Sequence, residues 1–220
     1  MIENATGLVL RTRPLTETSL IVHWLTPSFG RLATVAKGGR RPTSPFRGKL
    51  DLFYLVDFSF SRSRRSELHT LREVNLRETQ SVLREDLDRL RQASYVAALI
   101  EQATETETPI PALYDLMLGL LRHLGAHPPQ PQTVFAFEIR LLDHLGLKPD
   151  WEKSHLRPGT RHLVHLLEKA DWPVTARLKL SGPQVAELAQ FLHGFLVYYL
   201  ERIPKGRPGA LGDLCALGLP

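Results

Sequence analysis

The amino-acid sequence predicts an α+β protein of two domains, a small antiparallel β-barrel or sandwich in residues 1–80 and an all-helical domain in residues 81–220. Two observations predict this division. Apolar residues recur with a period of two, in short runs, up to residue 80 and with a period of about 3.6 after it. Residues 1–80 also carry 13 Lys or Arg against 7 Asp or Glu, whereas residues 81–220 carry 15 against 16.

Strand-length runs in the first domain are separated by turn signals. The run at 18–26 is rich in β-branched and aromatic residues and is followed by a Pro-Ser-Phe-Gly turn, and the run at 31–37 alternates before Gly38 and Gly39. The expected strands are residues 7–10, 18–26, 31–37, 52–60 and 68–76. Five short strands without helical crossovers favour a small antiparallel barrel or sandwich.

Helical periodicity governs the second domain. Pro111 stands where a first-turn proline belongs, and Gly146 stands where a helix commonly ends. The expected helices are residues 83–102, 111–125, 134–145, 160–170 and 183–202. Residues 147–158 show little periodicity and are expected to form a loop, and residues 206–209 a turn.

Composition excludes several classes of protein. The chain is 43% hydrophobic and 23% charged, and none of its apolar runs approaches the roughly 20 residues of a membrane span. The first residues contain neither a basic nor an apolar signal region, so we expect a cytoplasmic protein that does not bind membranes. The single cysteine, Cys215, cannot form an internal disulfide, and the hydrolase and phosphate-loop motifs are missing. We therefore expect neither catalysis nor a cofactor.

A basic segment is the strongest functional signal. Residues 18–50 contain six Lys or Arg and not one carboxylate, a pattern that requires an external anion or leaves the segment repelling itself. Single-stranded DNA supplies such an anion, and glycines let a phosphate approach the backbone. The candidate DNA-binding residues are Arg31, Lys37, Gly38, Gly39, Arg40, Arg41, Arg47 and Lys49. The alternative is that these are solvated loop charges.

A second basic cluster and two aromatic residues complete the candidate interface. Arg62, Arg64 and Arg65 follow the long strand at 52–60, and we expect a closed barrel to bring them to the same face as the first cluster. Most aromatic side chains in the first domain should form its core. Tyr54, which is out of phase with Phe53, and Trp24, near a hairpin, are the candidates for base stacking.

The order of these features resembles the bacterial RecO family of recombination mediators. The motifs that carry the resemblance are GLVL (7–10), RPLTETSLI (13–21), GRL (30–32), AKGGRR (36–41) and FEIRLLDHLG (137–146). The resemblance implies an N-terminal OB-fold and a helical C-terminal domain. It also implies a nucleoid-associated protein that binds single- and double-stranded DNA, anneals complementary strands, and helps load recombinase with RecR onto strands covered by single-strand binding protein.

The chain departs from that family pattern in one region. Many relatives carry a four-cysteine zinc module after the Leu-Gly pair that corresponds here to residues 145 and 146, and the degenerate region, about 147–159, has none of these cysteines. His155, His162 and His165 lie in or near it, and a carboxylate follows at Glu168. Because no strong fourth ligand is evident, we expect no metal.

Two apolar helix faces in the second domain admit two interpretations. Either the faces around 113–120 and 191–199 bury one another, or a groove remains for the apolar tail of single-strand binding protein, with Arg122 or Arg140 pairing its carboxylate. Two other functions stay open. The chain is either a protein–protein adaptor without a direct DNA role or, less favoured, a histidine-ligated metallohydrolase.

Overall fold

A computed structural model describes residues 1–212 of the chain, which divides into two compact units. The first unit comprises Met1–Ser81 and Thr104–Leu118, and the second comprises Val82–Ala103 and the residues from Gly119 onward. The segment 104–118, which follows the first long helix, therefore packs with the N-terminal unit. Cys215 lies outside the described residues.

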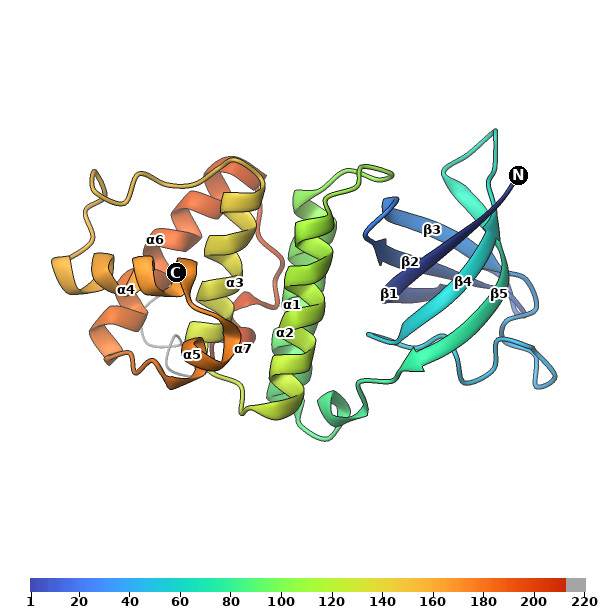
Figure 1. Ribbon diagram of the computed structural model, residues 1–220, viewed down its shortest axis with the longest axis horizontal. Helices are drawn as coiled ribbons and strands as arrows, with labels where there is room; N and C mark the ends of the chain where they lie inside the picture. Colours follow the sequence, from blue (N-terminus) through green and yellow to red (C-terminus); the bar gives the residue numbers. More distant parts are fainter. Residues whose placement is uncertain (213–220) are drawn as a thin grey trace. The chain divides into compact units, whose positions relative to one another are not determined.

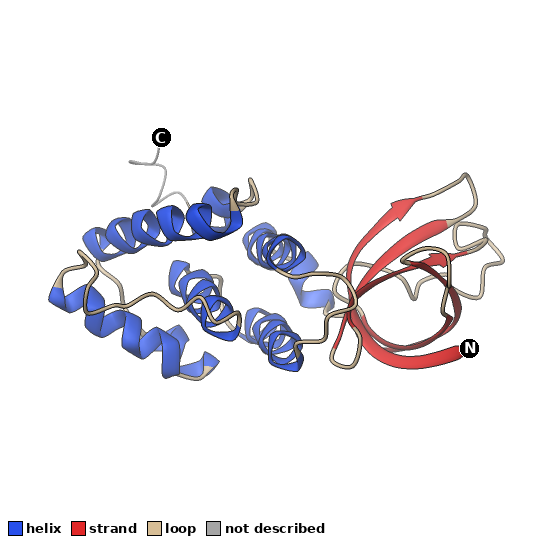
Figure 2. Cartoon of the chain, turned by 90° about the horizontal axis from the view of Figure 1, so that it is seen from above, coloured by secondary structure: helices blue, strands red, loops and turns tan. Residues whose placement is uncertain are grey.

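Five strands close into a barrel in the first unit (Figures 1 and 2). They are β1 (Ile2–Pro14), β2 (Leu20–Thr26), β3 (Gly30–Ala36), β4 (Leu55–Ser61) and β5 (Leu68–Glu78). Their order around the barrel is β1-β2-β3-β5-β4, with β4 pairing back to β1. This is the five-stranded, Greek-key arrangement of an OB-type barrel, and the predicted fold class is confirmed.

One pair of neighbouring strands is parallel in this otherwise antiparallel barrel. β3 and β5 run parallel, with Ala33 beside Leu68 and Val35 beside Thr70, whereas the other four neighbouring pairs are antiparallel. Strand directions cannot alternate all the way around a ring with an odd number of members. Closing five strands therefore requires one parallel pair.

Aromatic residues from β2 and β4 fill the barrel. Trp24 is fully buried, stacks on Phe58 with ring centroids 4.1 Å apart, and donates its Nε1–H to Thr34 Oγ1 over 2.8 Å. Phe60 is also fully buried, and Phe46 from the β3–β4 loop enters the same core. That buried phenylalanine holds the long loop 37–54 against the barrel.

Helices make up the rest of the described chain (Figure 1). They are the 3₁₀ helix η1 (Ser81–Arg84) and α1 (Leu87–Ala103), α2 (Pro111–Ala126), α3 (Pro131–His144), α4 (Pro158–Lys169), α5 (Trp172–Arg177), α6 (Gly182–Leu200) and α7 (Arg207–Leu211). Proline occupies the first turn of α3 to α7, where its missing N–H costs no helical hydrogen bond. No helix in residues 1–212 combines the length and apolar content that a membrane span requires.

A buried ion pair explains a helix that the sequence did not predict. Residues 206–209 were expected to form a turn, but Arg207 begins α7 and is only 2% exposed. Its Nε and Nη2 donate to the two carboxylate oxygens of Glu138 on α3, over 2.7 and 2.9 Å, and Tyr95 on α1 donates its hydroxyl to the same carboxylate. These charge-assisted hydrogen bonds hold α7 within the second unit.

Candidate nucleic-acid interface

The turn after β3 presents three cations to solvent. Lys37, Arg40 and Arg41 are exposed, and a tight turn that closes between Arg41 N–H and Gly38 C=O places them side by side. Gly38 has a φ of +67°, which favours glycine. Arg40 also connects this turn to the β1–β2 turn, because its backbone N–H donates to a carbonyl of that turn over 2.9 Å. The predicted basic cluster is therefore held on an ordered end of the barrel.

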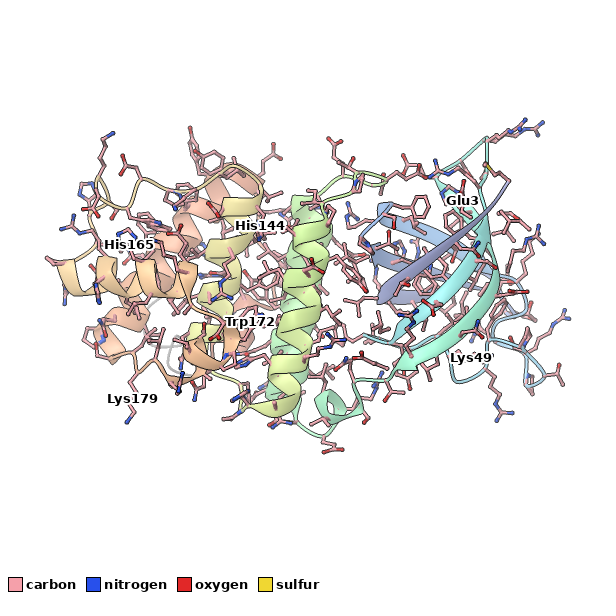
Figure 3. All side chains as sticks on the ribbon, viewed as in Figure 1. Glu3, Lys49, His144, His165, Trp172 and Lys179 are labelled. Atoms are coloured by element: carbon pink, nitrogen blue, oxygen red, sulfur yellow. The ribbon has the colours of Figure 1, made fainter. Side chains whose placement is uncertain are left out.

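Two further predicted cations lie along the β3–β4 loop. Arg47 is exposed and donates Nη1 to the carbonyl of Pro42 over 3.2 Å. Lys49, labelled in Figure 3, is half-buried and donates its ammonium to the carbonyl of Val74 on β5 over 3.3 Å. Arg47 is thus exposed along the loop, whereas Lys49 is partly engaged by the barrel itself.

Two arginines that the sequence analysis did not select extend this basic surface. Arg11 and Arg13 are exposed on β1, where they pair with His23 and Ile21 of β2. Burial, and after it the nearby charges of Arg11, Arg13 and Arg31, lower the pKa of His23 from 6.5 to about 4. Alternation along a strand could have identified Arg11 and Arg13, but Glu17 separates them in the sequence from the carboxylate-free segment.

The outer face of β1, β4 and β5 carries charges of both signs, because Arg72 and Arg77 on β5 are exposed as well as its carboxylates. It carries a polar cavity of about 370 Å³ whose lining includes Asp57 and Glu73. Burial would raise the pKa of Asp57, but hydrogen bonds from Thr6 and Arg77 outweigh it and hold this pKa below its usual value. An ionised Asp57 repels phosphates, so the candidate nucleic-acid interface is the side of the barrel formed by β1, β2 and the β3–β4 loop.

The second predicted cluster, Arg62, Arg64 and Arg65, lies near the start of β3. Arg64 and Arg65 are exposed in the β4–β5 loop, and the guanidinium of Arg62 lies 5.8 Å from the ring centroid of Phe29, in the turn that precedes β3. The first cluster follows the opposite end of β3. Seven strand residues span about 20 Å, so the two clusters form two patches rather than the single patch that was expected.

Arg31 is engaged by a segment that we call the strap, residues Thr104–Thr108, between α1 and α2. Arg31 donates Nε to Thr104 Oγ1 over 2.7 Å and Nη2 to the Thr104 carbonyl, and it is half-buried. Its own carbonyl accepts the backbone N–H of Glu107 over 2.7 Å. The structure therefore assigns Arg31 to holding the strap, and its guanidinium is not presented to a phosphate.

The structure corrects one of the two predicted stacking residues. Trp24 is fully buried in the barrel core, with its indole N–H satisfied, and cannot meet a base in the folded protein. Its burial follows from strand parity, because Trp24 shares the inward face of β2 with Val22. Tyr54 is half-buried, packs against the same core, and precedes β4. Tyr54 stays a candidate for base stacking, through the exposed part of its side chain.

The structure also corrects the prediction that Arg140 pairs with the carboxylate of a bound tail, because the guanidinium donates to groups of the protein itself. Its guanidinium donates to the carbonyls of Leu167 and Ala170 and to Thr175 Oγ1, where α4 ends and α5 begins. It also lies 4.5 Å from the ring centroid of Trp172. The last carbonyls of α4, which have no hydrogen-bond partner within the helix, thus accept hydrogen bonds from this guanidinium. Arg122 on α2 is exposed.

The degenerate zinc region is held by apolar packing. Trp151 is 3% exposed, and its ring lies 5.6 Å from that of Phe191 on α6. His155 and His162 are exposed. His165 on α4, labelled in Figure 3, has its Nε2 3.3 Å from Oε1 of Glu152. Within residues 1–212, no three His, Cys, Asp or Glu side chains are grouped closely enough to hold a metal ion.

These features define a class of protein: an OB-type barrel with a cation-rich end, joined to an all-helical region. Two family models match the chain, Recombination protein O N terminal over residues 1–80 and Recombination protein O C terminal over residues 84–155. The two matches together cover more than half of the sequence. The chain belongs to the RecO family.

Curated relatives agree with this assignment. The chain is 34% identical over 141 residues to the DNA repair protein RecO of Exiguobacterium sibiricum, which covers 64% of this chain and 56% of that one. It is 32% identical over 132 residues to the protein of the same name from Rhodopirellula baltica, covering 60% and 49%. The relative from Bacillus subtilis is 32% identical over 125 residues, covering 57% and 48%. The matches span about half the length of these relatives.

Proposed function

We propose that this protein acts in recombinational DNA repair as a non-enzymatic mediator that binds single- and double-stranded DNA and anneals complementary strands. The observation that carries the proposal is the basic end of the barrel, defined as Arg11, Arg13, Lys37, Arg40 and Arg41. Lys37 and Arg41 form no ion pair with a carboxylate in residues 1–212. Solvent-exposed cations without internal counter-charges attract phosphates and release their condensed counterions.

Annealing requires no bond chemistry. Two complementary strands pair with a favourable free energy, and the barrier is the repulsion between their phosphates together with the structure and proteins already on each strand. A surface that holds cations beside both backbones lowers this repulsion. The two basic patches at opposite ends of β3 are arranged for such a role, because each can contact a different stretch of nucleic acid.

The proposal includes two protein partners, RecR and single-strand binding protein. For an apolar tail that ends in a carboxylate, the best supported site is a cavity of about 420 Å³ in the second unit. Leu87, Leu90 and Pro204 form part of its apolar lining, and Arg91 and Lys205 contribute cations. This cavity replaces Arg140 as the expected tail site, since the guanidinium of Arg140 is already bonded. Arg122 stays a second candidate for the tail carboxylate.

Charge reversal tests DNA binding. The triple variant Lys37→Glu, Arg40→Glu and Arg41→Glu should lose most of its affinity for a fluorescent oligonucleotide at low salt. A control triple variant, Lys153→Glu, Lys169→Glu and Lys179→Glu, changes the net charge equally at exposed positions of the second unit. If both variants bind alike, the protein has no local site on the barrel and only its net charge attracts DNA.

Salt dependence separates this function from the adaptor alternative. Contact with several phosphates makes the logarithm of the binding constant fall with the logarithm of salt, at a slope of about −0.7 for each phosphate of a single strand. An adaptor that binds protein through apolar contacts should show little salt dependence and no complex with the oligonucleotide. Annealing of two complementary oligonucleotides, with and without single-strand binding protein, tests the activity itself.

A further inference from the structure

The β4–β5 loop is attached to the strap mainly through the carboxylate of Glu107. Glu107 places Oε1 2.7 Å from Nε2 of His69 and Oε2 3.1 Å from Nη1 of Arg62. The strap also donates Thr106 Oγ1 to Glu67 of the same loop over 3.2 Å. A segment from between two helices thus contacts both ends of the basic loop that contains Arg64 and Arg65.

His69 transmits this attachment to the backbone of the loop. It is 1% exposed, at the start of β5, and its ring stacks on Phe60 with centroids 5.2 Å apart. Its Nδ1 accepts the backbone N–H of Ser63 over 3.2 Å, so in the neutral ring the proton is on Nε2 and is donated to Glu107. Both ring nitrogens are therefore used, one for the strap and one for the loop.

The strap is itself held in one conformation. Glu107 has a φ of +55°, which non-glycine residues rarely adopt. Its backbone N–H donates to Arg31, and Arg31 also forms a parallel bridge with Thr106. A strained residue persists where its surroundings fix it from several sides, and here the backbone and both carboxylate oxygens do so.

We propose that Glu107 and His69 are positioning residues that hold the β4–β5 loop ready to bind nucleic acid. In this arrangement Arg64 and Arg65 contact phosphates, whereas Arg62 is neutralised by Glu107 and anchors the loop. Arg64 and Arg65 are exposed and form no ion pair with a carboxylate in residues 1–212, in contrast to Arg62. The inference rests on the proposed DNA-binding function and adds a role for the strap.

The direction of one mutational effect distinguishes positioning from simple electrostatics. Glu107→Ala removes a negative charge beside a basic loop, so electrostatics alone predicts tighter binding of an oligonucleotide. Loss of positioning predicts weaker binding, by about two- to ten-fold, because the freed loop must be ordered on binding. Glu107→Gln removes the same charge and the ion pair with Arg62 but keeps an oxygen that accepts the proton of His69, so it should bind the oligonucleotide more tightly than Glu107→Ala does.

The experiment measures oligonucleotide affinity by fluorescence anisotropy at several salt concentrations, with thermal melting as the check on folding. We expect Glu107→Ala to weaken binding and Glu107→Gln to recover part of the loss. Equal or tighter binding by the folded Glu107→Ala protein overturns the proposal. Arg64→Gln should reduce the magnitude of the salt slope by about 0.7, and Arg62→Gln should leave it unchanged. The opposite pattern for these two exposed arginines would also overturn it.

Failure of this inference differs from failure of the proposed function. If the unmodified protein forms no complex with the oligonucleotide at low salt, the DNA-binding function is wrong and the role of the strap falls with it. If the unmodified protein binds and the reversal at Lys37, Arg40 and Arg41 weakens it, while Glu107→Ala does not, only the positioning role is wrong.

Discussion

Replacing Arg207 with methionine tests the buried ion pair that fixes α7. Methionine keeps much of the length of the side chain and removes its three observed donors. Those donors are Nε and Nη2, which bind Glu138 over 2.7 and 2.9 Å, and Nη1, which binds the carbonyl of Ala189 over 3.1 Å. Burial by itself would lower the pKa of Arg207, but attraction to Glu138 outweighs it and raises this pKa, so the guanidinium stays charged.

The expected loss follows from what the variant leaves behind. Glu138 is 0% exposed, and in the variant its carboxylate would keep only the hydroxyl of Tyr95, at 2.5 Å, of the donors described. Removing one partner of a buried ion pair costs about 3–5 kcal/mol, because the remaining charge has no compensation. Folded proteins are stable by only about 5–15 kcal/mol, so the second unit should lose a large part of its stability.

Urea unfolding followed by far-ultraviolet circular dichroism measures this loss. Adding Glu138→Met to Arg207→Met should recover most of it, since no buried charge is then left unpaired. The control is Arg91→Met, which breaks an ion pair of 2.8 Å with Asp88 that is more than half exposed on both sides and should cost about 0–1 kcal/mol. A loss below about 1 kcal/mol for Arg207→Met, or no recovery in the double variant, would refute the reasoning.

Three further predictions concern single positions. Gly30→Ala should lower the free energy of unfolding by about 2–3 kcal/mol, since Gly30 has a φ of +65° and an added Cβ would lie 2.2 Å from the carbonyl oxygen of Thr108; an unchanged melting temperature would contradict the strap geometry. His123→Phe should raise stability at pH 7 by about 1 kcal/mol, because both ring nitrogens of the buried His123 lack a hydrogen-bond partner in residues 1–212. Burial is the main cause that lowers the pKa of His123 from 6.5 to about 4. Between these pH values only the unfolded chain takes up the proton, so the free energy of unfolding decreases as the pH is lowered. Urea titrations at pH 7 and pH 5 should therefore differ less for the variant than for the original protein, and an equal difference would count against this account. Trp151→Ala should lower the free energy of unfolding by about 3–5 kcal/mol, because it leaves a cavity in the second unit. Calorimetry measures this loss, and a loss under about 1 kcal/mol would show that Trp151 does not anchor the 147–159 region.

Local sequence patterns predicted the elements well where each pattern is complete within one segment. The five strands and the five longer helices were all expected, because alternation and helical periodicity are properties of neighbouring residues. β1 extends further than expected, since its polar ends are strand only through pairing with β2 and β4. α5 and α7 were missed because they are short, and α7 depends on Glu138, 69 residues away.

The candidate site shows the same division between local and distant information. The exposed cations of the turn at 37–41 were predicted from composition, because a run without carboxylates is visible in the sequence. Arg11 and Arg13 join them only through strand register. The sequence suggested Arg31 as a DNA-binding residue and Arg140 as a partner for the carboxylate of a bound tail. In the folded chain, backbone carbonyls accept hydrogen bonds from both guanidinium groups.

Local patterns in the sequence predicted a barrel or sandwich, the helical region, the resemblance to the RecO family and the location of the excess positive charge. Each of these features depends on residues that are near one another along the chain. The folded chain alone shows which cations its own backbone engages, that Trp24 lies in the core and that the strap contacts the β4–β5 loop. The physical reason is that a hydrogen bond or a buried contact depends on distance in space, and barrel closure brings together groups that the sequence keeps far apart.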